Sequence, residues 1–216
     1  MDGCFKYKIN NIPVLYEDDC LLIVDKPPGL LTIPAPGNKQ PTLTDILNRG
    51  VKNGGVSYRL HPCHRLDKDT SGLIVYAKGK SIQKRMMELF KGKKIKKIYV
   101  AFVQGRLSQD KGQISYPIQG QSALTEYRII ETRKDFSVLE VMPLTGRKNQ
   151  IRIHFNTIGH PVVGEKKFAF RRDYQLRANR LCLHAKALEF THPAVKKTVS
   201  VISELSTGMK NFLEKH

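Results

Sequence analysis

The sequence shows few of the features that mark secreted, membrane-spanning or disulfide-bonded proteins. Its first ten residues, MDGCFKYKIN, include no long apolar segment, so we expect no signal peptide. Apolar runs such as Leu21–Val24 are far shorter than the roughly 20 residues needed to cross a bilayer. The cysteines are scattered without a CxxC pair, at Cys4, Cys20, Cys63 and Cys182. This pattern predicts unpaired thiols, a cytoplasmic chain and no zinc site.

Internal repeats, low-complexity segments and a regular alternation of strands with helices are also absent from the sequence. Apolar and β-branched residues predict strands within 14–25, 98–104 and 181–203, and a hairpin within 125–142. Apolar stripes predict helices over 81–91 and 148–158, with a short helix near the C-terminus. The proline-rich segment 26–41 is expected to form an ordered surface loop.

This pattern of elements predicts the fold class. Strands grouped with so few helices are typical of an α+β domain, and they argue against a doubly wound fold. We expect a mixed, largely antiparallel sheet flanked by helices and loops. A chain of 216 residues fits one domain, so we expect a single catalytic domain over 1–216 with its core at about 12–205.

The balance of charge favours a polyanionic partner. Lysine and arginine number 37 against 19 acidic residues, which gives a net charge of +18 and a pI near 9.9. Such an excess captures nucleic acid readily, because each neutralised phosphate releases condensed counterions. A membrane surface is the second alternative, and plain solubility is the third. Phosphate contacts are expected from the run 91–97, which includes Lys93 and Lys94, and from the four arginines between residues 171 and 180.

The segment HPCHRLDKDTSGLIVYAKG, residues 61–79, concentrates reactive side chains just before an apolar strand. Loops at strand ends often present functional groups from a rigid support. The composition alone favours a polar turn, because Asp, Thr, Ser and Gly are all good turn formers. His61, Cys63 and His64 lack the spacing and the fourth ligand of a metal site, so we expect no metal there.

Residues 64–72, HRLDKDTSG, resemble the signature of the RluA-type pseudouridine synthases, in which HRLD precedes two variable residues and TSG. Further blocks resemble the family's other motifs in family order: DKPPGLLT at 25–32, KKIYVAFVQG at 96–105, LTGRKNQIRIHFNTIGHPVVGEKKF at 144–168 and LCLHAKALEFTHP at 181–193. The resemblance spans residues 14–205 and implies the pseudouridine synthase fold. It also implies an isomerase that detaches a uridine of RNA at N1–C1′, rotates the base and rejoins it through C5. Neither a metal nor an organic cofactor is implied.

The resemblance assigns catalytic roles to three residues. Asp67 matches the essential aspartate, and a carboxylate can stabilise or attack the positive charge that develops at the sugar carbon. Covalent attack and proton abstraction through a glycal remain open. Arg152 matches the arginine that pairs with this aspartate and favours its ionised form. Tyr99 matches the tyrosine that stacks on the flipped base.

A second group of residues is expected to bind the substrate RNA. Arg65 matches an arginine that helps to evert the nucleotide, a step that costs a few kcal/mol of stacking. Lys26 and Pro27 are expected to shape the pocket wall. The set is completed by Thr70, Arg147, Asn149, Lys93 and Lys94.

Three positions depart from the family pattern. Asn149 stands where the family usually has histidine, Gly164–Glu165 replaces a Gly-Asp pair, and Phe168 replaces a tyrosine. We interpret these positions as structural and expect activity to be retained, since asparagine can also donate and accept hydrogen bonds.

Two other functions remain as alternatives. One is an RNA-binding or ribosome-assembly module that has the fold without turnover, and the other is a hydrolase that uses Asp67 and Asp69 as a carboxylate pair. The chain starts almost at the catalytic core, so we expect no N-terminal S4-type RNA-binding domain. A stem-loop of tRNA or of large-subunit rRNA is the expected substrate, and a monomer is the default expectation.

Overall fold

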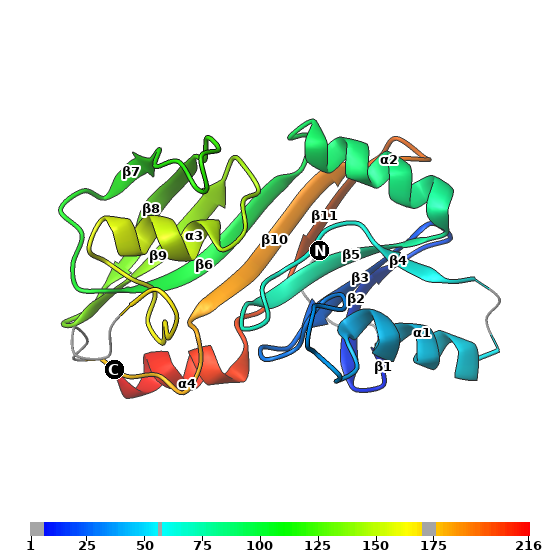
Figure 1. Cartoon of the computed structure of the whole chain (residues 1–216), viewed down its shortest axis with the longest axis horizontal. Helices are drawn as coiled ribbons and strands as arrows, with labels where there is room; N and C mark the ends of the chain where they lie inside the picture. The colour runs from blue at the N-terminus through cyan, green and yellow to red at the C-terminus, as the bar shows by residue number, and fades with distance from the viewer. Residues whose placement is uncertain (1–6, 56–57, 170–175) are drawn as a thin grey trace. The chain divides into compact units, whose positions relative to one another are not determined.

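The computed structural model describes residues 7–55, 58–169 and 176–216 (Figure 1). Arg171 and Arg172 of the predicted phosphate-binding cluster, and Cys4, lie outside the described residues. The chain divides into two compact units, residues 1–96 with 186–204 and residues 97–185 with 205–216. The single catalytic domain predicted from the sequence therefore stays a prediction. In the described part of the chain, no helix combines the length and apolar character needed to span a membrane.

The first unit is built on an antiparallel sheet. Its strands are β1 (Tyr7–Ile9), β2 (Ile12–Glu17), β3 (Leu21–Lys26) and β5 (Ser71–Lys78), hydrogen-bonded in that order. The short β4 (Leu60–Pro62) pairs with β5, and β11 (Thr198–Ile202) pairs with β10 (Leu183–Thr191). β3 and β5 are buried almost throughout, which is the pattern of strands covered on both faces.

Two helices cover opposite faces of this sheet, α1 (Leu43–Asn53) and α2 (Lys80–Lys91) (Figure 1). Val75 packs in one core cluster with Met86 of α2, whereas the hydroxyl of Tyr76 lies 3.1 Å from Thr44 Oγ1 of α1. Successive residues of a strand point to opposite faces, so the two helices lie on opposite sides. α1 approaches β1 so closely that a Cβ on Gly50 would lie 2.2 Å from Ile9.

The strands of the second unit pair antiparallel and are covered by two core clusters. Its strands run in the order β6 (Lys96–Gln104), β9 (Phe136–Pro143), β8 (Thr125–Thr132) and β7 (Lys111–Ile114). Helix α3 (Gln150–Thr157) buries Ile151 and Phe155 against one face, and α4 (Thr207–Lys215) buries Met209 and Phe212 on the other.

Most helices and strands whose hydrophobic residues recur at a regular spacing were predicted from the sequence. The helices expected at 81–91 and 148–158 are α2 and α3, and the hairpin expected within 125–142 is β8 and β9. Helix α1 was not predicted. It buries only Leu43, Leu47 and Val51 and contains Gly50, so its apolar stripe is one residue per turn.

Candidate active site

Asp67 lies half-buried in the loop between β4 and β5 of the first unit. The loop is fastened to β5, because Cys63 N–H donates to the Val75 carbonyl at 2.9 Å and Val75 N–H donates to His64 Nε2 at 3.1 Å. The His64 ring also lies 4.5 Å from the Phe90 ring of α2. On the far side of Asp67, Thr70 N–H donates to the Asp67 carbonyl at 3.2 Å. The backbone that carries the carboxylate is therefore held on both sides.

The segment after β3 braces the same loop from a second direction. Lys26 is fully buried, and its ammonium donates to the carbonyls of Pro27 at 2.8 Å, Leu30 at 2.7 Å and Lys68 at 2.9 Å. The hydroxyl of Thr32 donates to the carbonyl of Leu66 at 3.1 Å. Leu66 and Lys68 are the two neighbours of Asp67 in the chain. Lys26 thus acts on the loop from inside the fold, which fits a role in shaping the pocket wall and not a direct contact with RNA.

Lys26→Met is expected to lower the free energy of unfolding by about 3 kcal/mol, because the carbonyls that accept from Nζ would lose a charged donor. Activity should fall with it, since the loop of Asp67 loses its brace. Urea unfolding and tritium release from C5-labelled RNA would measure the two effects. Lys52→Met in α1 is the matched control, because that side chain is exposed and its loss should change stability by less than about 0.5 kcal/mol. A Lys26→Met protein as stable as the wild type would contradict this role.

The other predicted residues of the loop differ in exposure. Arg65 is exposed to solvent, whereas the Thr70 side chain is 2% exposed. Thr70 Oγ1 has no hydrogen-bond partner in the described structure. A buried hydroxyl without a partner is uncommon in a folded protein, and the role of Thr70 as a substrate contact stays a prediction.

Arg152 of the second unit is held by a buried carboxylate that the sequence analysis did not identify as its partner. Its Nε and Nη2 donate to the two oxygens of Glu165, each at 2.7 Å, and its Nη1 donates to Asn149 Oδ1 at 3.0 Å. The side chains of Arg152 and Glu165 are 8% and 1% exposed. The guanidinium also lies 5.1 Å from the centre of the Phe168 ring. All three positions that depart from the family pattern therefore surround Arg152.

The position of Glu165 depends on the glycine before it. Gly164 has a φ of 81°, and a Cβ there would lie 1.9 Å from the carbonyl oxygen of Arg180. Glu165 Oε1 also accepts from the backbone N–H of Lys166 and Lys167, at 3.0 and 2.7 Å. Burial alone would raise the pKa of Glu165, but the hydrogen bonds from Arg152 and from backbone N–H groups together lower it below its ordinary value. The pair is therefore ionised at neutral pH.

The predicted pairing of Arg152 with Asp67 joins residues of two different compact units, so it stays a prediction. A sequence signal for Glu165 did exist, namely an acidic residue at the place of the family's Gly-Asp pair. We interpreted that position only as structural. The acid is the bidentate partner of the arginine expected to be catalytic.

Asn149 begins α3 in the left-handed conformation, with a φ of 56°. Asparagine tolerates this conformation better than most residues. Its neighbour Gln150 fastens the preceding loop, accepting from the backbone N–H of Arg147 at 2.9 Å and donating to the carbonyl of Leu124 at 2.9 Å. Arg147 Nε donates to the carbonyl of Ser122 at 3.1 Å. Tyr99 is half-buried in β6, opposite Val141, and packs against the core under α3.

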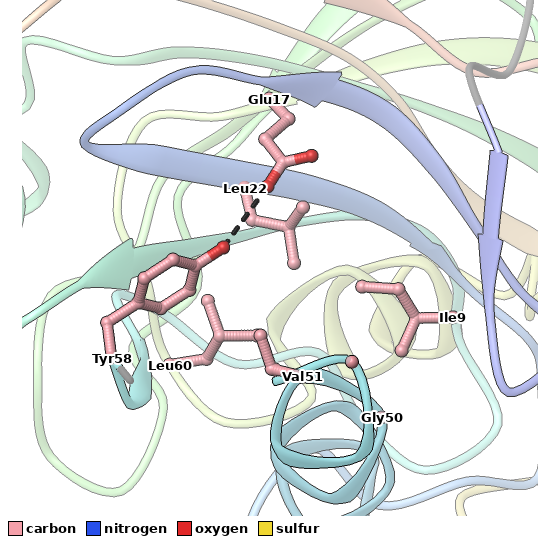
Figure 2. A pocket seen from close by; sticks show the side chains of 8 residues that line it. Ile9, Glu17, Leu22, Gly50, Val51, Tyr58 and Leu60 are labelled. Carbon is pink, nitrogen blue, oxygen red and sulfur yellow. Dashed lines mark hydrogen bonds between the residues drawn. The ribbon is translucent and has the colours of Figure 1, made fainter. Parts of the chain in front are cut away.

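The first unit contains a cavity of about 200 Å³ (Figure 2). Ile9, Leu22, Val51 and Leu60 form its apolar wall, and Tyr58 donates to Glu17 at 3.3 Å at its polar end. None of the predicted catalytic or RNA-binding residues lines it. We assign it no part in the candidate active site.

Asp18, Cys20 and His192 form one group within the described chain whose possible metal-ligand atoms lie within 4.8 Å of one another. His192 Nδ1 accepts from the backbone N–H of Ala194 and Val195, at 3.2 and 3.1 Å. His192 Nε2 lies 3.1 Å from Asp18 Oδ2. Asp18 Oδ1 accepts from the backbone N–H of Cys20 and Leu21, at 2.8 and 2.7 Å, so we interpret the group as a hydrogen-bonded corner.

Comparison with known proteins places these observations in a family. Residues 20–157 match the family model of RNA pseudouridylate synthases. The chain is 37% identical over 198 residues to the dual-specificity RNA pseudouridine synthase RluA of Yersinia pestis, covering 83% of this chain and 92% of that protein. It is 32% identical over 221 residues to the uncharacterized RNA pseudouridine synthase YlyB of Bacillus subtilis, covering 94% and 72%.

A solved structure supports the fold independently. The human RNA pseudouridylate synthase domain containing 4 superposes with a TM-score of 0.81 at 24% identity, covering 94% of this chain and 92% of that one. Agreement at this level of identity concerns the fold alone. It confirms the α+β class predicted from the sequence.

Proposed function

Because this chain belongs to the RNA pseudouridylate synthase family, of the RluA type, and isomerises uridine in RNA to pseudouridine, we propose that Asp67 is the residue that acts on the target nucleotide. The observation that carries this assignment is the bracing of its loop, in which both chain neighbours of Asp67 are held by the segment 26–32. Catalytic groups must be held close to one geometry, because a small displacement of a reacting atom costs a large part of the rate.

The reaction cleaves the N1–C1′ bond, forms a C5–C1′ bond, removes the proton from C5 and places one on N1. The base is neither oxidised nor reduced, so its atoms balance without a co-reactant. The carboxylate of Asp67 would stabilise or trap the electron-poor sugar carbon while the base rotates. Tyr99 would offer its ring to the everted base, and Arg65 would enter the space that the base leaves.

Arg152 would supply the positive charge near Asp67. Its bidentate bond to Glu165 and its bond to Asn149 restrict how the guanidinium can turn. Arg147 and Thr70 complete the proposed contacts with the nucleotide. Release of tritium from RNA labelled at uridine C5 tests the whole assignment, and tight RNA binding without release would favour the module that binds without turnover.

The proposed substrate is a stem-loop of tRNA or of large-subunit rRNA, since sequence-specific RNA recognition favours loops whose bases can be splayed out. A relative named as having dual specificity supports more than one RNA as substrate. We place the reaction in the cytoplasm, where these RNAs are found, and we propose a monomer, because one chain supplies Asp67, Tyr99 and Arg152. Competition between the two RNAs in a band-shift assay would exclude whichever binds no better than random RNA.

Lys93 is proposed to contact a backbone phosphate, and its conformation allows a test that separates binding from stability. Lys93 has a φ of 55° in the turn that ends α2, where Lys94 N–H donates to the Leu89 carbonyl at 2.9 Å. Glycine is favoured at such a position. Lys93→Gly should therefore raise the free energy of unfolding by roughly 1 kcal/mol while weakening RNA binding. Urea unfolding and filter binding would measure the two quantities.

A second lysine provides the control for this variant. Lys196 has a φ of 59° in the turn between β10 and β11. Lys196→Gly should stabilise the fold to a similar extent without changing RNA affinity. If Lys93→Gly bound RNA as tightly as the wild type, Lys93 would be removed from the RNA-binding set.

A further inference from the structure

The solvent face of α2 carries a row of lysines that none of the catalytic roles uses. Its buried side contains Met86 with Ile82, Leu89 and Phe90 packed around it. The opposite side presents Lys80, Lys84 and Lys91, all exposed. These residues are spaced by four and seven positions, which places them in line along one face of a helix. At 1.5 Å per residue the row is about 16 Å long.

The charge of this region is far denser than that of the rest of the chain. Residues 80–96 contain seven basic residues and one acidic residue, a net of +6 out of the +18 of all 216 residues. In a nucleic-acid duplex, about 16 Å of axis carries roughly nine phosphate charges. The row of lysines is therefore long enough to face several phosphates along one side of a short duplex segment.

Contacts in the first unit connect this helix to the loop of Asp67. Gln83 of α2 donates from Nε2 to the carbonyl of Pro62 at 2.8 Å, and the ring of Phe90 lies 4.5 Å from that of His64. His64 directly precedes Arg65, and Lys91 directly follows Phe90. An RNA whose nucleotide reaches Asp67 would thus meet the C-terminal end of α2 next.

We propose that the solvent face of α2, with Lys80, Lys84 and Lys91, holds the phosphate backbone of the double-stranded stem that adjoins the target uridine. This inference rests on the proposed function and adds a second contact surface to it. A membrane would need an exposed apolar face on the same helix, and the apolar stripe of α2 is packed against the sheet. The lysines would bind phosphates of the stem and would not distinguish its base sequence.

The test uses a 16-base-pair blunt RNA duplex with no loop, so that binding does not require a flipped uridine. Kd is measured against salt concentration for the full chain, for Lys84→Gln/Lys91→Gln, and for Arg49→Gln/Lys52→Gln. The second pair is the matched control, because Arg49 and Lys52 are exposed on α1, on the opposite face of the same sheet. The α2 variant should lose about two units of the slope of log Kd against log salt and bind about tenfold more weakly, whereas the control should change little.

Turnover of a C5-labelled stem-loop, measured with the same proteins, separates the two proposals. A raised KM for the α2 variant with a long stem, and a smaller change with the stem cut to a few base pairs, would support the surface. Equal slopes for the α2 variant and the control would overturn it, even if the wild type is fully active. Binding of the wild type to anionic phospholipid vesicles, lost in the α2 variant while duplex binding is kept, would also overturn it. A wild type that binds the duplex but releases no tritium would count against the proposed function and leave the surface standing.

Discussion

Asp67→Asn is expected to abolish tritium release from C5-labelled RNA, lowering the rate at least about a thousandfold, as the loss of a catalytic nucleophile or charge typically does. The amide keeps the size of the side chain but cannot stabilise or trap the electron-poor sugar carbon. RNA affinity should stay close to that of the wild type, because phosphate contacts supply most of it. Single-turnover kinetics at saturating enzyme would measure the chemical step without interference from binding.

The control for this variant lies two residues further along the same loop. Asp69 is exposed, so Asp69→Asn makes the same chemical change without touching the proposed reaction. It should retain activity within a few-fold. Loss of activity in both variants would mean that Asp69 also takes part in the reaction, and full activity of Asp67→Asn would refute the proposed mechanism.

Glu165→Gln is expected to lower the free energy of unfolding by about 3–5 kcal/mol, the usual cost of removing one partner of a buried ion pair. The guanidinium of Arg152 would remain buried beside a neutral amide. We also expect activity to fall, because the bond that orients Arg152 is lost. Glu140→Gln is the matched control: Glu140 pairs with Arg128, whose side chain is 63% exposed, so its loss should cost less than about 1 kcal/mol.

The effect of Glu165→Gln should depend on pH in a defined direction. The pKa of Glu165 is lowered in the folded protein despite burial, because of its bonds to Arg152 and to backbone N–H groups. A carboxyl group whose pKa is lowered by folding stabilises the protein above its unfolded pKa, and this contribution disappears as pH falls through the folded pKa. The stability difference between the wild type and Glu165→Gln should therefore be largest near neutral pH and shrink in acid. A difference that stays constant with pH would contradict an ionised pair.

A double variant separates the structural role of the pair from its role in the reaction. Arg152→Met with Glu165→Leu removes both charges, and apolar replacement of a buried ion pair is often neutral or stabilising. Urea unfolding should show much of the stability of the wild type restored, while tritium release should stay low. Recovery of activity with stability would mean that Arg152 serves the fold alone.

The sequence by itself determined the chemistry and most of the periodic elements of this protein. HRLDKDTSG identified the loop of Asp67, since its residue types are adjacent in the chain and need no folding to be recognised. The apolar stripe of α2 and the hairpin of β8 and β9 were predicted for the same reason, because the periodic spacing of their hydrophobic residues lies within one continuous segment of the sequence. Helix α1 has a stripe of only one buried apolar residue per turn and was missed.

Only the tertiary structure decided which groups hold the reactive side chains in place. The ammonium of Lys26 donates to the carbonyl of Lys68, 42 residues away in the chain. The guanidinium of Arg152 donates to both carboxylate oxygens of Glu165. A backbone carbonyl belongs to every residue, so a bond to it leaves no mark in the sequence. Likewise, the left-handed conformations of Lys93 and Asn149 follow from how the chain turns between packed elements. The residues proposed to react were recognised from local sequence, whereas their orientation depends on contacts that exist only after folding.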